Sequence, residues 1–347
     1  MTIQELLAQA GGVGGNEVVL KSIAKTHHIL STHHKILVSV SGGADSDIVL
    51  DLIYKVSSIL GNDVTYVWFD TGIEYAATKR HLDYLEDKYG IKIVREKAIK
   101  PIPTTCKEYG QPFLSKFVSQ MIHALQLADF KWEDKPYEEL ILEYPNKDSY
   151  ISWWCNHRDT KDFGYSQFNI AYNKHLKEFL IANPPAFMID NKCCKYAKKD
   201  VSKYLLKKYP SDLLVLGIRK AEGGIRTVNY KTCFSDNGSD CDTFRPVFWY
   251  QGEDKKFYCD KFSITHSDCY TKYGMHRTGC AGCPYNRYLG DDLHIMEQFE
   301  PKLYKAVTTI FRESYEYTAK YKEFCKLQDQ QSTVGQIPLF EVKGPDV

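Results

Sequence analysis

The sequence lacks several features that would place it in a specialised class of protein. Its 347 residues contain no run of about eighteen apolar residues, so no transmembrane helix is expected. The first residues, MTIQELLAQAGG, lack the basic and apolar regions of a signal peptide. No internal repeat or low-complexity tract is present. These absences predict a cytoplasmic protein without a membrane partner.

A dominant charge is also missing. The 45 Lys and Arg residues nearly balance the 44 Asp and Glu residues, for a net charge of +1. Composition alone therefore does not indicate a nucleic-acid partner. With 43% hydrophobic and 26% charged residues, the chain resembles an ordinary folded protein. Its length allows one large α/β core or two small domains.

What the chain does contain is a set of short apolar runs that alternate with helical patterns. Strand-like runs occupy residues 35–40, 63–70, 91–96 and 211–219. Between the first three, residues 45–60 and 74–90 repeat apolar side chains at helical spacing. Apolar strands that alternate with helices are typical of βαβ units. We therefore expect an α/β fold with an open, mostly parallel sheet.

The remaining chain is expected to be mainly helical. Residues 110–130 and 166–183 have helical patterns, and residues 291–324 predict two helices with a break near Pro301. The expected organisation is an N-terminal helical segment at 1–30, the α/β domain at 31–290 with a helical insertion at about 101–192, C-terminal helices at 291–327, and a flexible, frayed tail at 328–347.

The stretch ILVSVSGGADSDIVLDLI, residues 36–53, joins an expected strand to an expected helix through two glycines. The unpaired N–H groups and positive end of a helix N-terminus favour an anion. Gly42 and Gly43 let the backbone approach phosphate groups closely. The stretch is not a Walker A loop, because no Gly-Lys-Ser/Thr follows. It is not a dinucleotide fingerprint either, because a third glycine is missing. The alternative is a tight turn in which Ser and Asp side chains cap the helix.

The order Ser-Gly-Gly-x-Asp-Ser resembles the PP-loop of the ATP pyrophosphatase superfamily. Its members cleave nucleotides between the α and β phosphates, or bind adenylyl sulfates at the same place. The segments FDTGIEYAATKRHLDYL (69–85), GIRKAEGGIR (217–226) and RPVFWY to GCAGCPY (245–285) resemble motifs of the phosphoadenylyl sulfate (PAPS) reductase family. This resemblance implies a PP-loop α/β fold that binds ATP or an adenylyl sulfate.

The resemblance also implies a nucleotide site at the carboxyl ends of the strands, where open parallel sheets bind ligands. The candidate catalytic residues are Asp45, Ser46, Arg219 and Arg226. The two arginines are included because guanidinium groups suit phosphate oxygens. Magnesium is expected to bridge the phosphates. The candidate nucleotide-binding residues are Ser39, Ser41, Gly42, Gly43, Asp45, Ser46, Asp70, Thr71, Gly72, Gly217 and Arg219. Asp70 has three open readings, as a magnesium ligand, a nucleotide contact or a helix cap.

Eleven cysteines in a reducing compartment indicate metal binding, catalysis or burial rather than disulfides. Cys193 and Cys194 are adjacent, and Cys280 and Cys283 form a Cys-x-x-Cys pair. In the iron–sulfur branch of the reductase family, such pairs bind one [4Fe–4S] cluster. The resemblance therefore implies that these four residues are the ligands of a cluster. Zinc is the alternative, since four thiolates suit it as well.

One motif of the reductases is absent. Their catalytic cysteine lies in a C-terminal Glu-Cys-Gly-(Leu/Ile)-His motif, whereas Cys325 here precedes neither Gly nor His. A second branch without this motif includes the ATP-pyrophosphatase subunit of bacterial DNA phosphorothioation systems. That resemblance implies hydrolysis of ATP to AMP and pyrophosphate, which activates an acceptor for sulfur transfer. A nucleic acid is one candidate acceptor, and a cysteine desulfurase is the sulfur donor that the family suggests.

Two other functions stay open. One is an adenylyl sulfate or PAPS reductase that uses Cys325, and the other is a regulatory protein that binds a nucleotide without turnover. Cys106 and Cys155 are further candidate reactive thiols. Arg226 and Arg245 have surface ion pairs as their alternative reading. The Trp- and Tyr-rich insertion is interpreted as a packed cap or protein interface, with nucleic-acid stacking as the alternative.

Overall fold

The computed structural model describes residues 2–157, 168–223, 230–238 and 241–334. The chain divides into two compact units. Unit 1 comprises Met1–Thr105, Cys193–Cys283 and Tyr288–Val307, and unit 2 comprises Cys106–Lys192, Pro284–Arg287 and Thr308–Val347. The two units are described separately below.

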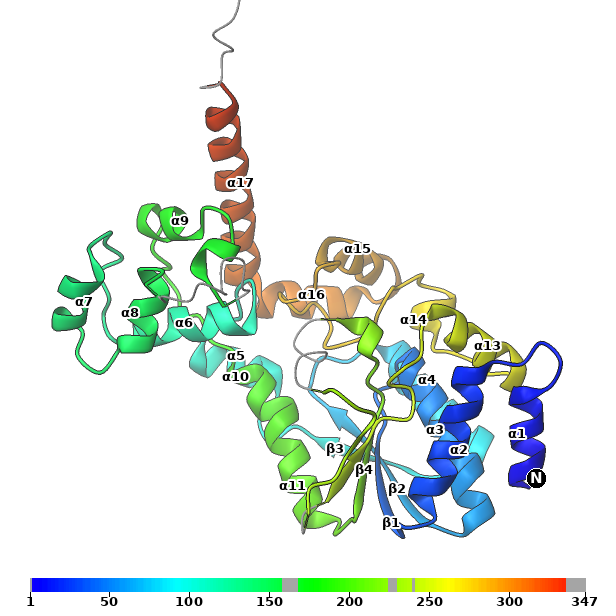
Figure 1. The fold of residues 1–347 in the computed structure, drawn as a ribbon. Coiled ribbons are helices and arrows are strands. Elements are labelled where there is room, and N and C mark those ends of the chain that lie inside the picture. The colour runs from blue at the N-terminus through cyan, green and yellow to red at the C-terminus, as the bar shows by residue number, and fades with distance from the viewer. Residues whose placement is uncertain (1, 158–167, 224–229, 239–240, 335–347) are drawn as a thin grey trace, which may run out of the picture. The chain divides into compact units, whose positions relative to one another are not determined.

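Unit 1 contains an open sheet in which the described strands follow the order β3-β2-β1-β4-β6-β5 (Figure 1). The strands are β1 (Lys35–Ser39), β2 (Asp63–Asp70), β3 (Ile93–Lys97), β4 (Leu213–Leu216), β5 (Phe234–Ser235) and β6 (Asp242–Phe244). Neighbouring strands are parallel except for the antiparallel pair β5 and β6. The predicted α/β fold with a mostly parallel sheet is therefore confirmed.

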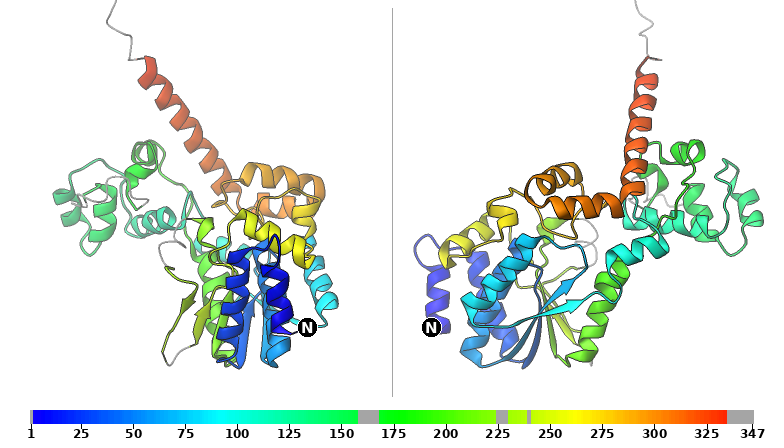
Figure 2. Two further views of the ribbon diagram at one scale, coloured as in Figure 1. Left: turned by 45° about the vertical axis from the view of Figure 1, so that its right-hand side comes forward. Right: turned by 180° about the vertical axis from the view of Figure 1, so that it is seen from behind.

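Helices cover both faces of this sheet (Figure 2). Ile36 and Val38 of β1 face a core built with apolar residues of α1 (Ile3–Gly11), α2 (Glu17–Leu30), α3 (Ala44–Leu60), α4 (Ala76–Tyr89) and α13 (Gly252–Phe262). Leu37 and Val67 face the opposite side and pack on Leu205 of α11 (Asp200–Lys208). This alternation is expected because successive side chains of a strand point to opposite faces.

Local sequence explains where the long helices of unit 1 begin and end. Helix α3 starts directly after Gly43 and stops at Gly61, whose φ of 71° lies in the left-handed region. Helix α4 stops in the same way at Gly90, with a φ of 60°. Glycine is favoured at such positions because it has no Cβ to strain. The remaining helices in unit 1 are α14 (Asp268–Thr271), α15 (Leu289–Phe299), a π-helical turn at Lys195–Lys199 and a 3₁₀ turn at Lys220–Glu222.

Three helices cross a boundary between the units in the sequence, namely α5 (Ile102–Tyr109), α10 (Lys192–Cys194) and α16 (Pro301–Ile310). Unit 2 itself contains α6 (Lys116–Gln126), α7 (Tyr137–Glu143), α8 (Asp148–Trp154), a 3₁₀ turn at Ile170–Tyr172, α9 (Leu176–Ala182) and α17 (Arg312–Val334).

The core of unit 2 is rich in aromatic side chains. Trp153 and Trp154 of the insertion are buried, and so is Phe179 of α9. The indole N–H of Trp154 donates to the Glu133 carbonyl at 2.9 Å. The hydroxyl of Tyr317 on α17 donates to the Asn183 carbonyl at 2.6 Å. These tryptophans pack inside unit 2, so they do not offer a surface on which bases could stack.

Several predicted elements differ from the structure. Residues 166–183 were expected to form one helix, but the part described from 168 on contains a 3₁₀ turn and then α9. The break falls at His175, which has a left-handed φ of 57°. The strand expected at 211–219 is only Leu213–Leu216. Strand β5 begins directly after Cys233 and pairs antiparallel with β6, which begins directly after Cys241.

The C-terminal region contains more helix than the sequence predicts. Helix α16 begins at Pro301, where a break was expected, but a second break at Phe311 separates it from α17. Helix α17 continues to Val334, past residue 328, where helical structure was expected to end. In the described part of the chain, no helix is both long enough and apolar enough to cross a membrane.

Candidate functional site

The glycine loop follows the carboxyl end of β1, which lies between β2 and β4 in the sheet. The connection from β1 leads through α3 to β2 on one side, while β4 comes from a much later part of the chain on the other. Open α/β sheets bind ligands outside the carboxyl ends of the strands, at such a switch in strand order. Ser39 is the last residue of β1 and pairs with Val67 and Leu216. The fold thus places the loop where a ligand is expected.

Side-chain hydroxyl groups accept hydrogen bonds from three backbone amides in and next to this loop. The Ser41 amide donates to Ser46 Oγ at 2.9 Å, and the Gly43 amide donates to Ser41 Oγ at 3.3 Å. The Ala44 amide, in the first turn of α3, donates to the Tyr270 hydroxyl at 3.3 Å. These amides already donate to oxygen acceptors, so they could equally donate hydrogen bonds to the oxygens of an anion. Tyr270 was not a predicted site residue, because its position follows only from the fold.

The glycines are required by close contacts. A Cβ at Gly42 would lie 2.7 Å from Thr78 Cγ2, and the φ of Gly42 is 68°. A Cβ at Gly43 would lie 3.1 Å from Thr278 Oγ1 and 3.3 Å from the Tyr270 hydroxyl. A Cβ at Gly217, just after β4, would lie 3.4 Å from the backbone of Ser46. Gly42 and Gly43 therefore let the side chains of Thr78, Thr278 and Tyr270 approach the start of α3, whereas a Cβ at Gly217 would make an ordinary contact.

We expect Gly42→Ala to lower the free energy of unfolding by about 2 kcal/mol or more. A left-handed alanine costs about 1–2 kcal/mol, and the contact with Thr78 adds to this cost. Urea unfolding of the purified chain measures the loss. Gly61→Ala is the matched control, because Gly61 has nearly the same φ of 71° but nothing within 4 Å of a new Cβ. Equal losses in the two variants would contradict the close approach of Thr78 to the loop.

Two cations converge on Asp45 in the first turn of α3. Arg219 Nε lies 2.8 Å from Asp45 Oδ2, and Lys255 Nζ lies 2.5 Å from Asp45 Oδ1. All three side chains are at most 21% exposed, so water screens their interaction less than it screens a surface pair. One carboxylate thus holds two cations beside the amino end of the helix. The sequence predicted Arg219 and Asp45, whereas Lys255 on α13 was missed, although it lies within the segment 245–285 that carries part of the family resemblance.

The Asp-Thr-Gly turn at the end of β2 forms a second part of this sheet edge. Asp70 Oδ1 accepts a hydrogen bond from the Gly72 amide at 3.0 Å. Thr71 donates to Glu74 Oε1 through both its amide, at 3.2 Å, and its hydroxyl, at 2.5 Å. One oxygen of Asp70 thus stabilises its own turn, while Lys79 lies 4.0 Å from the other. This contact is made within the turn and not at the first amides of α4, so the roles of Asp70 as a magnesium ligand or a nucleotide contact stay predictions.

The amino end of α4, next to this turn, already has an acceptor. The carboxylate of Glu300 accepts from the Ala76 amide at 2.8 Å and from the Ala77 amide at 3.1 Å. Negative side chains are stabilised at helix N-termini, so Glu300 fills the place that an anion would take. The start of α3 is therefore the better anion site of the two.

The Cys-x-x-Cys segment lies against the same sheet edge. The Ala281 amide donates to the Ile73 carbonyl at 3.1 Å, one residue after the Asp-Thr-Gly turn. Within the segment, the Cys283 amide donates to the Cys280 carbonyl at 3.3 Å. Burial is the main cause that raises the pKa of Cys280. The negative charges of Glu74 and Cys194 raise it further, whereas the positive charge of Lys198 lowers it. The fold thus brings Cys280 near Cys194, although the two are far apart in the sequence.

Lys198 gives this group of thiols a positive neighbour. The charge of Cys280 is the main cause that raises the pKa of Lys198, with Glu74 and Cys194 also contributing. Lys198 lies in the π-helical turn Lys195–Lys199, directly after the Cys193–Cys194 pair. Isolated π-helical turns are frequent at functional sites. An ammonium group beside thiols favours their thiolate form, which is the form that binds a metal.

The thiols of Cys193, Cys194, Cys280 and Cys283 have the right chemistry for a metal, but they do not form a recognisable metal site in the described part of the chain. All eleven cysteines lie in the described part of the chain, and none of them forms a disulfide. Among the described residues, no group of three or more His, Cys, Asp or Glu side chains is close enough to hold a metal ion. The assignment of Cys193, Cys194, Cys280 and Cys283 as ligands therefore remains a prediction.

Other predicted residues lie elsewhere. Arg226 falls outside the described residues. Arg245 is buried rather than at the surface; its guanidinium lies 3.9 Å from the Tyr230 ring centre and donates to the Thr232 carbonyl, so a surface ion pair is excluded. Cys325 belongs to unit 2, where its thiol donates to the Lys174 carbonyl at 3.4 Å. Of the other candidate thiols, Cys106 is buried.

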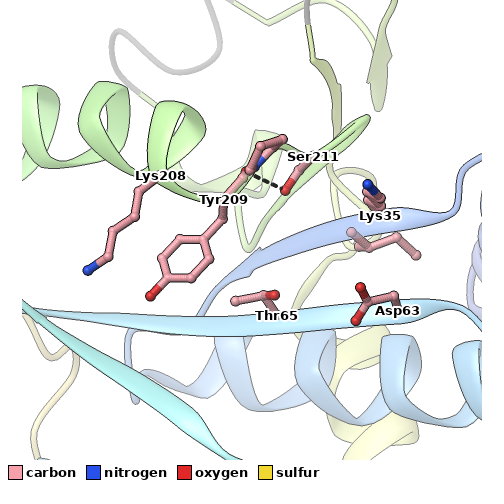
Figure 3. A pocket seen from close by; sticks show the side chains of 8 residues that line it. Lys35, Asp63, Thr65, Lys208, Tyr209 and Ser211 are labelled. Carbon is pink, nitrogen blue, oxygen red and sulfur yellow. Dashed lines mark hydrogen bonds between the residues drawn. The ribbon is translucent and has the colours of Figure 1, made fainter.

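A separate cavity of about 230 Å³ lies at the opposite edge of the sheet (Figure 3). Lys35 and Asp63 at the amino ends of β1 and β2 line it, together with Lys208, Tyr209 and Ser211. Since the glycine loop follows the carboxyl end of β1, this cavity is not part of the candidate nucleotide site.

Comparisons with known proteins identify the region around the glycine loop. Residues 35–127 match the family model of the phosphoadenosine phosphosulfate reductase domain. The predicted resemblance to this family is therefore confirmed for this region. An uncharacterised protein of Methanocaldococcus jannaschii is 32% identical over 161 residues, which are 45% of this chain and 30% of that protein. The chain thus matches less than a third of the length of this relative.

Solved structures show only distant likeness. A phosphoadenylyl-sulfate reductase from Candida auris in complex with phosphate is 11% identical, with a TM-score of 0.39 over 78% of this chain and 89% of that chain. The U34-tRNA thiolase NcsA from Methanococcus maripaludis, with its [4Fe–4S] cluster, is 11% identical, with a TM-score of 0.37 over 96% of this chain and 87% of that chain. At such scores, neither structure bears on the function of this chain.

Proposed function

Because residues 35–127 carry a domain of the phosphoadenosine phosphosulfate reductase family, we propose that the chain is a PP-loop ATP pyrophosphatase. It cleaves ATP between the α and β phosphates to give AMP and pyrophosphate, and this reaction activates an acceptor for sulfur transfer. The observation that carries the proposal is the convergence of Arg219 and Lys255 on Asp45, directly beside the glycine loop.

The loop binds the pyrophosphate part of the nucleotide in this proposal. The amides of Ser41, Gly43 and Ala44 now donate to side-chain hydroxyls, and phosphate oxygens would replace those hydroxyls as acceptors. Exchanging one set of oxygen acceptors for another costs little, because the amides stay paired throughout. The positive end of α3 adds to the attraction.

Arg219 and Lys255 supply the charge that the reaction needs. Negative charge develops on the pyrophosphate as it leaves, and preorganised cations stabilise such charge strongly where water is partly excluded. Asp45 holds both cations in place before the nucleotide binds. Arg226 has the same proposed role, on the motif alone.

The metal groups are also proposals. Magnesium bound with the nucleotide would lower the negative charge of the phosphate groups. The four cysteines Cys193, Cys194, Cys280 and Cys283 would hold a [4Fe–4S] cluster, with zinc as the alternative, and the cluster would supply a centre for sulfur handling. A cysteine desulfurase as sulfur donor and a nucleic acid as acceptor complete the proposal.

Pyrophosphate release tests this function. The purified full chain is incubated with ATP and magnesium, alone and with tRNA, DNA or small acceptors, and AMP and pyrophosphate are measured. We expect them in equal amounts, and we expect a variant with both Asp45→Ala and Ser46→Ala to lose the activity. ATP binding without release would favour a regulatory protein. Sulfite release from an adenylyl sulfate, lost in Cys325→Ser, would favour the reductase.

A further inference from the structure

A buried carboxylate next to the glycine loop has two histidine partners. Asp47, in the first turn of α3, is only 1% exposed. Its Oδ1 lies 2.9 Å from His81 Nε2 on α4, and its Oδ2 lies 2.8 Å from His266 Nδ1. His81 is 4% exposed at its side chain, whereas His266 is 21% exposed. The carboxylate therefore fixes both rings, and one of them reaches solvent.

The other side of the exposed histidine faces a thiol. His266 Nε2 lies 3.4 Å from Cys259 Sγ on α13, and Cys259 is partly buried. Because Asp47 contacts Nδ1, the opposite ring nitrogen is directed at the sulfur. This order of a thiol, an imidazole and a carboxylate is the arrangement that activates a nucleophile in enzymes, where the third group orients the base.

Electrostatics agree with this arrangement. Burial opposes the charged form of His266, but the hydrogen bonds to Asp47 and Cys259 outweigh burial and raise the pKa of His266 to about 9. The imidazole is therefore positively charged near neutral pH, and a positive imidazole next to a sulfur favours the thiolate form. The charged and titratable groups around it are Asp47 from α3, His81 from α4, Cys259 from α13 and Tyr270 from α14.

One turn further along α3, a similar carboxylate provides a useful contrast. Asp51 is 2% exposed and accepts hydrogen bonds from the hydroxyls of Tyr89 at 2.9 Å and Tyr258 at 2.8 Å. Lys55 completes this set at 2.5 Å. Phenols and a lysine satisfy Asp51 without any nucleophile. The comparison shows that a buried carboxylate on this helix can be satisfied without an imidazole and a thiol, so packing alone does not account for the presence of His266 and Cys259 at Asp47.

We infer that Cys259 is a reactive thiol, with His266 as its acid–base partner, and that it reacts with small compounds that contain a sulfur–sulfur bond. Asp47 and His81 are positioning residues for His266. This reaction needs no nucleotide, so the inference stands apart from the proposed pyrophosphatase activity.

The reaction is an exchange of sulfur–sulfur bonds. The Cys259 thiolate attacks the terminal sulfur of a persulfide R–S–SH, a new S–S bond to Cys259 forms, and the old S–S bond breaks. The leaving thiolate RS⁻ takes the proton of the His266 imidazolium and departs as RSH. With a disulfide R–S–S–R, the same attack leaves Cys259–S–S–R and RSH. Neither case needs an added oxidant or reductant.

Peptide-level mass spectrometry of the reduced full chain tests the inference. With limiting iodoacetamide at pH 7, we expect Cys259 to be alkylated about tenfold or more faster than Cys233 in the same molecule. Cys233 is a suitable comparison because it is also partly buried and packs against the same apolar core as Cys259. This comparison needs no variant, so misfolding cannot produce the result.

A variant then assigns the effect to the imidazole. His266→Gln should slow alkylation of Cys259 about tenfold at pH 7, and its rate should rise more steeply with pH than that of the original chain, since the thiol has lost its cationic neighbour. A merely structural role of His266 would not change the slope. Equal rates for Cys259 and Cys233, or an unchanged rate and slope in His266→Gln, would overturn the inference.

Glutathione persulfide and oxidised glutathione distinguish the two kinds of donor. Addition of a single sulfur to Cys259 shows persulfide transfer, and addition of glutathione shows disulfide exchange. Either product supports the inference when Cys259→Ser lacks it and Cys241→Ser retains it. If neither compound modifies Cys259, the inference is wrong. The result does not depend on whether the chain releases pyrophosphate from ATP.

Discussion

Arg219→Ala is expected to lower the rate of pyrophosphate release by about 10²–10³-fold, the usual loss when one preorganised charge-stabilising group is removed. The effect should appear mainly in kcat, because the charge develops in the transition state. Arg219 lies 2.8 Å from Asp45 and its other contact is the Tyr250 carbonyl at 3.4 Å, so its guanidinium serves the loop rather than the core. Steady-state kinetics with ATP and magnesium measure the change.

A double variant distinguishes two explanations of that loss. If Arg219 only neutralises Asp45, then combining Arg219→Ala with Asp45→Asn should restore most of the activity. If Arg219 acts on the phosphates, the double variant should stay as inactive as Arg219→Ala. We expect the second result. Lys256→Ala is the control, because Lys256 is an exposed residue of the same helix as Lys255 and pairs with Asp260.

Cys280→Ser is expected to remove most of the bound metal. Anaerobically purified protein should be brown and contain about four irons per chain, whereas the variant should be nearly colourless. Cys280 is the informative ligand because its segment is held to the sheet edge through Ala281 and Ile73, and because it interacts with Cys194. Iron, sulfide and zinc analysis of both proteins provides the measurement.

Cys269→Ala is the matched control for this experiment. Cys269 is fully buried, and its sulfur lies 3.8 Å from Thr78 Oγ1, so it is a packing residue. The control should retain its iron. Colourless protein with one zinc per chain would exclude the cluster, and unchanged iron in Cys280→Ser would exclude Cys280 as a ligand.

Much of the sheet was predictable because its signals are local. Each of the runs at β1 and β2 is continuous and apolar, and the glycines at 61 and 90 end the helices that follow. The glycine loop and Asp45 could be found for the same reason, since the turn and its helix are encoded in one short stretch. Arg219 was found through a family motif.

The rest of the candidate site depends on contacts between distant segments. Lys255 and Tyr270 reach the start of α3 only because α13 and α14 pack there, which the segment 245–285 does not reveal by itself. The group of Asp47, His266 and Cys259 is scattered in the same way over α3, the loop between α13 and α14, and α13. In unit 2, the left-handed residue His175 precedes the start of α9 and interrupts a helix that the periodicity alone would extend.

The position of β4 in the chain has a consequence for what a partial sequence match can mean. Arg219 and Asp45 are 174 residues apart, and the whole insertion lies between them. Closing so long a loop costs only slightly more than closing a shorter one, so the fold tolerates the insertion. The family match, however, ends at residue 127. The matched region therefore contains the glycine loop and Asp45 but neither Arg219 nor Lys255. A fragment cut to this region would present a phosphate with the carboxylate of Asp45 without the two cations that pair with it.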